Sequence, residues 1–474
     1  MPIDEHIAIV DSGKELQQKL LSAIQKHLDA PDPRIRSLVR IEVPIFSIDP
    51  LVWLGMQSDS ERMYWRGRHA DDRVAMFGVA KVMSGDSRPE YPDLAREVDD
   101  FLERPGADLR LYGGMRFDLD RNADHDWYGF PAWRFVLPRF EMHQRGKHTL
   151  LCCNLVLPED YAVRDALIQQ VQELCFPDSG QEKVQQQEKK SPQVPKPVSR
   201  VDNPGFEGWK AQVNWSLDAF HRDLVDKVVL ARRVDFSFQQ APDPVSLLRI
   251  LEDATPNCFH FLFTSQEGVF LGATPERLFF RRGREVTSEA VAGTRPRGET
   301  SDDDQAYMAS LLDSEKDQRE HAFVRERIRD VLGGLCESVS VDENATEMRL
   351  AQGRHLVSRV SGRLREGVTD FHLLEQLPPT PAVGGVPTEI ALEAIHSLED
   401  FDRGWYAGPV GWIGRDSAEF AVALRCGVVR GSQLSLFSGA GLVQGSDPGS
   451  EWIEIEQKIT DFTKIIGLEI RTAD

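Results

Sequence analysis

The sequence lacks the features that would tie this protein to a membrane or to nucleic acid. It contains no uninterrupted apolar run of about 18 residues, the length that a membrane-spanning helix needs. Its first residues, Met1-Pro-Ile-Asp-Glu-His6, lack the basic stretch and apolar run of a signal peptide. Positive charge is scarce, because 56 lysines and arginines stand against 76 aspartates and glutamates and leave a net charge of −20. We therefore expect a cytoplasmic protein without nucleic acid or a membrane as partner, since both favour a basic surface.

Cysteine is also scarce and unpatterned. The six cysteines form no CxxC pair and have no interleaved histidines at a spacing suited to zinc. Free thiols in a reducing compartment are therefore expected. The remaining composition is ordinary for a soluble enzyme, since 474 residues that are 41% hydrophobic and 28% charged suffice for one large or two medium cores. Because the chain is acidic, an anionic substrate must be held by local cations.

The amino-terminal part has the pattern of a sheet with one or two helices. Apolar residues recur at four-residue steps over residues 13–29, which predicts an amphipathic helix. Strand-like sequence covers residues 37–45, 73–82 and 133–141, and Gly113-Gly114 predicts a turn. No internal repeat of solenoid period is present.

A polar segment divides the chain. Residues 178–200 are rich in Gln, Lys, Glu, Ser and Pro, with almost nothing apolar except valine, which is typical of a linker or loop. We therefore divide the chain into an amino-terminal part of the body at 1–180, a polar linker or loop at 181–200 and a catalytic part at 201–474.

The catalytic part begins with an amphipathic helix over residues 206–224. Lys227 comes directly after this helix, at the start of the strand-like run 228–238. Residues 259–263 alternate like a strand, and residues 269–280 form the predicted hairpin partner.

Acidic residues occupy particular places in the predicted elements that follow. Glu276 lies on a bend within the hairpin. Ser301 and the acids after it predict a helix that runs to Gly333-Gly334, with Glu320 in line with an apolar stripe. A carboxylate on a core-facing stripe needs a partner. The last helix should begin near Ser450.

Five short polar segments are set into apolar sequence between residues 227 and 458. Together they offer a lysine, a glutamate next to arginine, a glycine turn and two separated glutamates, which general acid–base chemistry beside a hard metal ion would need. No single segment is diagnostic. The segments are Lys227-Val-Val-Leu-Ala-Arg232, Ala273-Thr-Pro-Glu-Arg-Leu278, Ala292-Gly-Thr-Arg-Pro-Arg297, Glu320-His321 and Glu451-Trp-Ile-Glu-Ile-Glu-Gln-Lys458.

In their order along the chain and in their residue types, these segments resemble the motifs of the chorismate-utilising enzymes. This family includes isochorismate synthases, salicylate synthases and the large components of anthranilate and aminodeoxychorismate synthases. The resemblance covers about residues 205–468. It implies an α+β fold of the chorismate-binding type, a sandwich with mostly antiparallel sheets and outer helices, and chorismate as the substrate.

The resemblance assigns Lys227 as general base and Glu276 as general acid. From residue type alone, Lys227 would be a strand-end lysine that reaches water, and Glu276 would pair with Arg277. Anthranilate and aminodeoxychorismate synthases typically have glutamine at the matching position, whereas isochorismate and salicylate synthases have lysine. Lys227 therefore indicates that water attacks C2 of chorismate while Glu276 protonates the departing C4 hydroxyl, which produces isochorismate.

The resemblance also implies a magnesium site. Glu320 and Glu454 match the family's metal motifs, and Glu451 would be a further or water-mediated ligand. Mg²⁺ accepts one or two protein carboxylates, keeps waters and takes the remaining oxygens from its substrate. The alternative for Glu454 is a helix-surface ion pair with Lys458.

Several residues match the family's substrate contacts. Gly293, Thr294 and the predicted turn Gly439-Ala440-Gly441 would offer backbone groups to substrate oxygens. Arg425 aligns with the arginine for the substrate's side-chain carboxylate, which suits a guanidinium fork. Lys458 would add a second positive contact.

Other positions distinguish branches of the family. His355 resembles the histidine of the pyruvate-eliminating branches, but we expect it only to line the pocket of an isomerase. Ala292 cannot form the covalent adduct of a lysine that aminodeoxychorismate synthases commonly have there. Pro378 replaces a histidine that the family often has, whereas Thr380-Pro-Ala-Val-Gly-Gly385 favours isochorismate synthase.

We predict a Mg²⁺-dependent isochorismate synthase without a glutamine amidotransferase subunit. Its amino-terminal half and residues 404–412 resemble the isochorismate synthases of menaquinone biosynthesis, although those of siderophore biosynthesis differ little in these regions. The alternatives are a salicylate synthase, which goes on to eliminate pyruvate, and a non-catalytic chorismate-binding paralogue.

Overall fold

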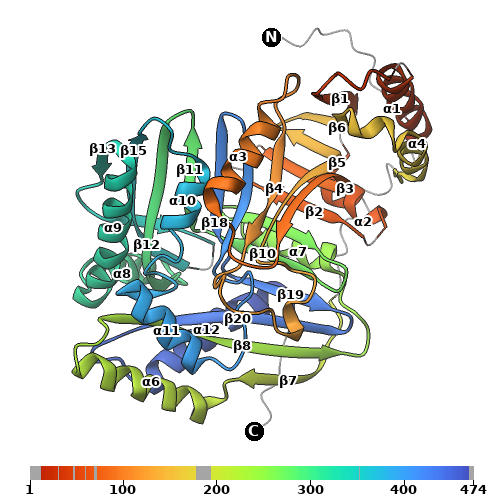
Figure 1. Cartoon of the computed structure of the whole chain (residues 1–474). Helices are drawn as coiled ribbons and strands as arrows, with labels where there is room; N and C mark the ends of the chain where they lie inside the picture. Colours follow the sequence, from red (N-terminus) through yellow and green to blue (C-terminus); the bar gives the residue numbers. More distant parts are fainter. Residues whose placement is uncertain are drawn as a thin grey trace.

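The computed structural model shows strands joined into one extended sheet, with helices on its outer faces (Figure 1). The long ladders are antiparallel: β3 (Asp72–Gly85) with β5 (Trp133–Arg145), β12 (Glu285–Pro296) with β15 (Gly353–Leu364), and β20 (Gln433–Val443) with β8 (Lys227–Phe238). The predicted α+β class is confirmed. The structure describes residues 12–29, 31–45, 48–58, 60–68, 72–177, 194–351 and 353–468.

The amino-terminal elements agree closely with the sequence pattern. Helix α1 (Gly13–Leu28) begins after Ser12, whose side chain accepts a hydrogen bond from Glu15 N, and buries its four-residue apolar stripe. The three predicted strands appear as β1 (Ser37–Ile45), β3 and β5. No helix in the described ranges has the length and apolar character needed to cross a membrane.

The predicted Gly113-Gly114 turn is wrong. Both glycines lie within β4 (Arg110–Met115), which pairs with β5 on one side and with β17 (Pro409–Gly414) on the other. A Cβ atom at Gly113 would come within 1.8 Å of the Arg134 carbonyl oxygen. These glycines therefore permit close strand packing, a role that sequence reading confuses with a turn.

The amino-terminal part shares the sheet with the catalytic part. Besides the β4–β17 ladder, β2 (Arg62–Arg66) pairs with β9 (Phe259–Thr264), so that Tyr64 lies opposite Leu262. These pairings make the two parts one hydrogen-bonded body, which agrees with the expectation that the amino-terminal part contributes strands to it.

The last residues of the predicted linker are structured. β7 (Pro197–Asn203) pairs with β8, so residues 197–200 of the segment assigned to the linker or loop form part of a strand. Residues 181–193 lie outside the described residues. Helix α6 (Phe206–His221) follows, as predicted.

The long helix predicted from Ser301 is two helices. α8 (Ser301–Leu312) begins after Thr300, and α9 (Glu315–Leu335) begins after Ser314, whose side chain accepts from Asp317 N. This second N-cap separates the helices, and Gly333-Gly334 lie inside the last turn of α9 instead of ending it.

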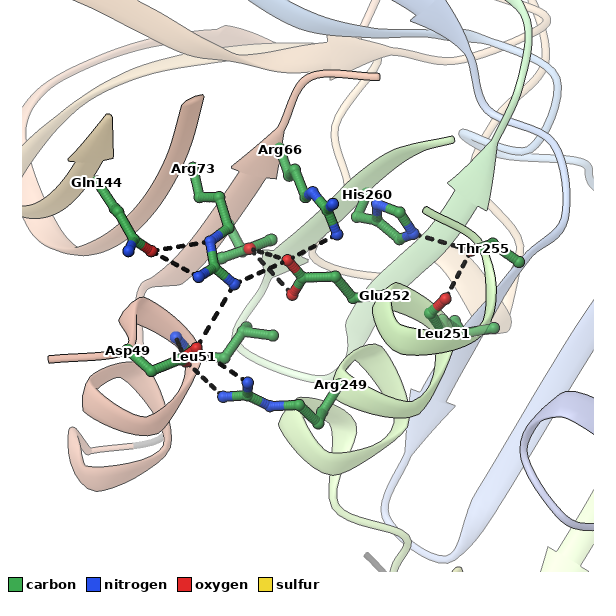
Figure 2. Close-up of polar contacts among 11 residues, drawn as sticks. Asp49, Leu51, Arg66, Arg73, Gln144, Arg249, Leu251, Glu252, Thr255 and His260 are labelled. Carbon is green, nitrogen blue, oxygen red and sulfur yellow. Dashed lines mark hydrogen bonds and ion pairs between the residues drawn. The ribbon is translucent and has the colours of Figure 1, made fainter. Parts of the chain in front are cut away.

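A buried polar network ties the amino-terminal part to α7 (Pro244–Ala254) (Figure 2). Glu252 accepts hydrogen bonds from Tyr64 at 3.1 Å, Arg66 at 2.9 Å and Arg73 at 3.1 Å. Arg249, one turn earlier on α7, bonds Asp49 at the start of α2 (Pro50–Met56). The network therefore fixes α7, which carries part of the cavity wall described below.

All six cysteines are free thiols, and Cys175 alone is exposed.

The remaining elements complete the sheet and its cover. The elements are α3 (Tyr91–Leu102), β6 (His148–Leu157), α4 (Arg164–Glu173), β10 (Val269–Thr274), β11 (Arg277–Arg282), β13 (Cys336–Val341), β14 (Thr346–Arg349), α10 (Asp370–Gln376), β16 (Gly385–Val386), α11 (Thr388–Leu398), β18 (Ser417–Val422), β19 (Cys426–Arg430) and α12 (Pro448–Ile465).

Candidate active site

A cavity of about 640 Å³ lies where β8 and β20 meet β12, α9 and α12. All five polar segments contribute to its wall, although they are far apart in the sequence. It is lined by 11 of the 13 residues proposed from the sequence, the exceptions being Ala440 and Glu451. The fold therefore gathers nearly the whole predicted set.

Lys227 is the first residue of β8 and is only 2% exposed. Among the described residues its amine has no hydrogen-bond or ion-pair partner. Burial lowers the pKa of this amine, and the charges of Glu320 and Glu276 oppose that change only in part. The site thus shifts the amine toward its neutral form, the form that can accept a proton.

Glu276 lies on the bend between β10 and β11, as predicted, and is 4% exposed. Burial raises the pKa of its carboxyl to about 8, although the nearby Lys227 acts to lower it. The alternative pairing with Arg277 does not occur, since Arg277 bonds Glu289 and Glu419. Glu276 therefore retains its proton near neutral pH and can donate it.

The bend that carries Glu276 is held from the amino-terminal part. Arg68 donates to the Pro275 carbonyl oxygen at 2.9 Å and pairs with the buried carboxylate of Glu289. Thr274 accepts from Glu276 N at 3.3 Å. Sequence reasoning missed Arg68, because nothing in the local sequence links it to a bend 207 residues away.

Glu320 faces the cavity from α9. Burial raises the pKa of its carboxyl, while Lys227 and Lys316 lower it. It has no hydrogen bond or ion pair with any residue that the structure describes. Asp317, one turn earlier, pairs with Arg295 at 2.7 Å. Glu320 is therefore a carboxylate that needs a cation.

The two glutamates on α12 have lysine partners. Glu454 lies 2.8 Å from Lys458. The charge of Lys458 lowers the pKa of the Glu454 carboxyl, burial raises it, and the net pKa is lowered. Glu451 is buried and lies 3.2 Å from Lys316. Within the described ranges, no three His, Cys, Asp or Glu residues form a group that could hold a metal ion. The ion pair of Glu454 with Lys458, which was the alternative to a metal role, is present.

The residues present nevertheless fit a magnesium ion. Glu320 and Glu454 project from separate helices into one cavity, and the charge of Glu454 raises the pKa of Glu320. Two carboxylates beside open space suit Mg²⁺, which takes its other ligands from water and substrate. The metal assignment stays a proposal.

The predicted turn at Gly439-Ala440-Gly441 is wrong, because these residues lie within β20 and pair with β8. Gly439 and Gly441 line the cavity, whereas Ala440 packs into the hydrophobic core. A Cβ atom at Gly441 would lie 3.0 Å from Lys227 Cε and 3.7 Å from Glu320 Oε1. Glycine therefore leaves room for the Lys227 side chain, which a Cβ atom here would displace by a few tenths of an ångström.

The part of β20 that lines the cavity keeps one edge outside the ladder with β19. The ladder with β19 ends at Leu436, so beyond it one edge of β20 has no strand partner among the described residues. Lys458 donates to the Gly439 carbonyl oxygen at 2.9 Å on this side. Strand geometry, and not a turn, presents the polar backbone to the cavity.

A hydrogen-bonded chain joins β12, β15 and the β18–β19 connection. His355 bonds the Gly293 carbonyl oxygen at 2.9 Å through Nδ1 and receives a hydrogen bond from Arg425 at 3.1 Å on Nε2. Thr294 lies 3.1 Å from the same Nδ1. Because the guanidinium can only donate, Nε2 accepts and Nδ1 carries the proton. Burial and the charge of Arg425 lower the pKa of His355 to about 3, so the ring is neutral.

Arg425 has a φ of 46°, in the left-handed region that non-glycine residues rarely adopt. Its carbonyl oxygen accepts from Ala273 N at 3.1 Å, which holds this conformation. Strained backbone of this kind persists where surrounding contacts impose it, often at functional sites. In this conformation the Arg425 side chain bonds His355 and lines the cavity.

The loop after α10 also reaches the site. Ala382 and Val383 line the cavity, whereas Pro378 does not. A Cβ atom at Gly385 would lie 2.2 Å from the Lys227 carbonyl oxygen, so this glycine lets the loop pair with the start of β8. Tyr406, which sequence reasoning missed, stacks on Phe437 at 5.4 Å in the cavity wall.

Fold and site together define a chorismate-utilising enzyme. Residues 23–467 match the family described as chorismate binding enzyme, and the chain belongs to this family.

Within the family its relatives include isochorismate synthases. Isochorismate synthase 2, chloroplastic, from Arabidopsis thaliana is 31% identical over 97% of this chain and 86% of its own length. The isochorismate synthase MenF of Bacillus subtilis is 28% identical over 97% of this chain and 99% of its own. The structure of MenF, the menaquinone-specific isochorismate synthase from Escherichia coli, has a TM-score of 0.81, 26% identity, and coverage of 95% of this chain and 99% of its own.

Proposed function

We propose that this protein is a Mg²⁺-dependent isochorismate synthase that adds water at C2 of chorismate and removes the C4 hydroxyl. The observation that carries this proposal is the pair Lys227 and Glu276. Burial lowers the pKa of the lysine and raises that of the glutamate to about 8, so one cavity shifts an amine toward its neutral, proton-accepting form and holds a carboxyl that is protonated near pH 7.

The two proton transfers balance. Lys227 takes a proton from the attacking water as its oxygen bonds to C2, and the ring double bonds shift. Glu276 gives its proton to the C4 hydroxyl, which leaves as water. The enzyme ends with an ammonium and a carboxylate, which exchange protons with solvent before the next turnover. The reverse reaction uses the same pair with the roles exchanged.

The other residues bind and orient. Arg425, which is hydrogen-bonded to His355, would form a fork with the substrate's side-chain carboxylate, and Lys458 would add positive charge. Glu320 and Glu454 would hold Mg²⁺, which when bound supplies positive charge for a substrate carboxylate. In an acidic protein these local cations are what attracts an anionic substrate.

The main rival is salicylate synthase, in which isochorismate formation is followed by loss of pyruvate. One observation supports the isomerase. Both ring nitrogens of His355 are engaged, with Gly293 and with Arg425, and the low pKa of about 3 that burial gives this ring keeps it from serving as an acid. A non-catalytic paralogue is disfavoured because Lys227, Glu276, Glu320 and Glu454 all line the cavity.

Incubation of the purified protein with chorismate and Mg²⁺ tests the proposal. We expect isochorismate without free pyruvate and without added glutamine or ammonia. Stoichiometric salicylate and pyruvate would establish the rival reaction. Chorismate binding without turnover under any divalent cation would identify a non-catalytic paralogue. Whether the product enters a menaquinone or a siderophore route is a separate question, for which we propose the menaquinone route on the resemblance of residues 404–412.

A further inference from the structure

Lys316 lies at the edge of the cavity, in the first turn of α9. Its Nζ atom is 3.2 Å from Glu451 Oε1 on α12, which makes an ion pair between the two helices of the proposed metal site. The carboxylate side chain is 3% exposed and the lysine side chain 51% exposed. One end of the pair is therefore fixed in the protein, and the other can reach solvent.

Lys316 interacts with more than one carboxylate. Burial favours its neutral amine, but the charges of Glu451, Glu320 and Glu454 outweigh burial, so the net effect raises the pKa of Lys316. The ammonium group therefore lies in the field of all three glutamates assigned to the metal. No partner other than Glu451 bonds its amine within the described ranges.

The contact between α9 and α12 carries more negative than positive charge. Three carboxylates meet two ammonium groups there, and the adjacent Lys227 is driven toward its neutral form by burial, which lowers its pKa. With a divalent cation in place of one ammonium group, the positive and negative charges would be equal. The carboxylates belong to Glu320, Glu451 and Glu454, and the ammonium groups to Lys316 and Lys458.

We propose that Lys316 is a built-in counter-ion that occupies the cation's place among these glutamates in the metal-free protein and is displaced when Mg²⁺ binds. This inference rests on the metal assignment of the proposed function. It adds that metal affinity is set by competition with a residue of the chain itself.

The chemistry of lysine suits this role. A buried carboxylate such as Glu451 is costly without a positive partner, so the metal-free site needs a cation to stay ordered. Lysine supplies a compact point charge on a flexible stem, and its half-exposed side chain can move its charge to water. An arginine would bind the carboxylate with two parallel hydrogen bonds and would leave less readily.

The test is a titration of Mg²⁺ alone, without chorismate, into metal-stripped protein by isothermal calorimetry. The variants are Lys316→Gln, which removes the charge, and Lys316→Arg, which keeps it. Lys19→Gln is the matched control, because Lys19 forms a lysine–glutamate pair with Glu15 at 3.5 Å on α1. The Tm of each protein is measured in EDTA and again at saturating Mg²⁺.

We expect Lys316→Gln to bind Mg²⁺ about threefold to tenfold more tightly, since the energy of a partly buried ion pair no longer opposes the metal. Its Tm in EDTA should be lower than that of the wild type, and the increase in its Tm on adding Mg²⁺ should be larger. Lys316→Arg should bind Mg²⁺ as weakly as the wild type or more weakly, and Lys19→Gln should match the wild type.

Equal or weaker Mg²⁺ binding by Lys316→Gln, beside a wild type that binds, would overturn the counter-ion role and leave the proposed function intact. A drop in Tm of equal size with and without Mg²⁺ would assign Lys316 a purely structural role. A wild type that binds no Mg²⁺, either alone or with chorismate present, would overturn the metal assignment itself, and this inference with it.

Discussion

Lys227 and Glu276 share one cavity, and burial moves their pKa values in opposite directions, downward for the amine and upward to about 8 for the carboxyl. Neither side chain has a hydrogen bond to relieve the shift among the described residues. Burial thereby shifts each group toward the protonation state that its proposed role in acid–base catalysis requires.

Loss of either group should cost on the order of a hundredfold or more in kcat, because a general acid and a general base each contribute about that much. Lys227→Gln should still bind chorismate, since a polar side chain of similar length remains. Glu276→Gln should lose both the forward and the reverse reaction. The measurement is kcat in both directions at fixed Mg²⁺. Near wild-type isochorismate formation by Lys227→Gln would show that another group activates the water.

The pH dependence follows from the same pair. Glu276 must be protonated and Lys227 neutral, so kcat/KM should fall as pH rises through about 8, where Glu276 ionises, and should fall on the acid side as Lys227 gains a proton. The folded protein holds the Glu276 proton more tightly than the unfolded chain does, so this group should make stability decline between its usual pKa and about 8. A rate profile that stays flat well above pH 8 would contradict the assignment of Glu276 as the acid.

Removal of a metal carboxylate should abolish turnover without unfolding the protein. Glu320→Gln and Glu454→Gln keep the size of the side chain but weaken magnesium binding, because the amide oxygen carries no charge. Calorimetric titration of Mg²⁺ and a thermal melt separate loss of metal from loss of fold. Unchanged kinetics in either variant would remove that residue from the metal site.

Gly441→Ala should reduce activity sharply with little effect on the fold. The new methyl group would lie 3.0 Å from Lys227 Cε and would push the base from its position. Misplacement by about 1 Å can cost on the order of a hundredfold in rate. Gly334→Ala is the control, because its Cβ atom meets nothing within 4 Å. Equal kcat in both alanine variants would mean that Lys227 need not lie against β20.

Glu252→Ala should destabilise the protein by roughly 3 to 5 kcal/mol, because it leaves the buried Arg66 without its carboxylate partner. Glu15→Ala, which breaks a surface pair on α1, should change stability little. Denaturant unfolding monitored by fluorescence gives both values. A small effect for Glu252→Ala would show that water or Asp49 replaces the lost partner in the network of Figure 2.

Local elements were predictable where a single periodicity covers a whole segment. Helix α1 and strand β1 follow their apolar patterns closely, and Glu276 lies on the bend that Pro275 indicates. The prediction failed at two segments that contain glycine. Gly113-Gly114 and Gly439-Ala440-Gly441 were taken for turns, but both lie in strands, and at Gly113-Gly114 the neighbouring strands approach too closely for a side chain.

The sequence by itself determined the family, the α+β class and a set of site residues of which 11 of 13 line the cavity, because short polar segments stand out within apolar strands and helices. Only the tertiary structure decided how these residues act on one another. Burial depends on what packs over a group, so the pKa shifts of Lys227 and Glu276 could not be read from the chain. The pairing of Lys316 with Glu451, 135 residues away, and the support that Arg68 gives to the catalytic bend likewise arise from contacts that no local pattern encodes.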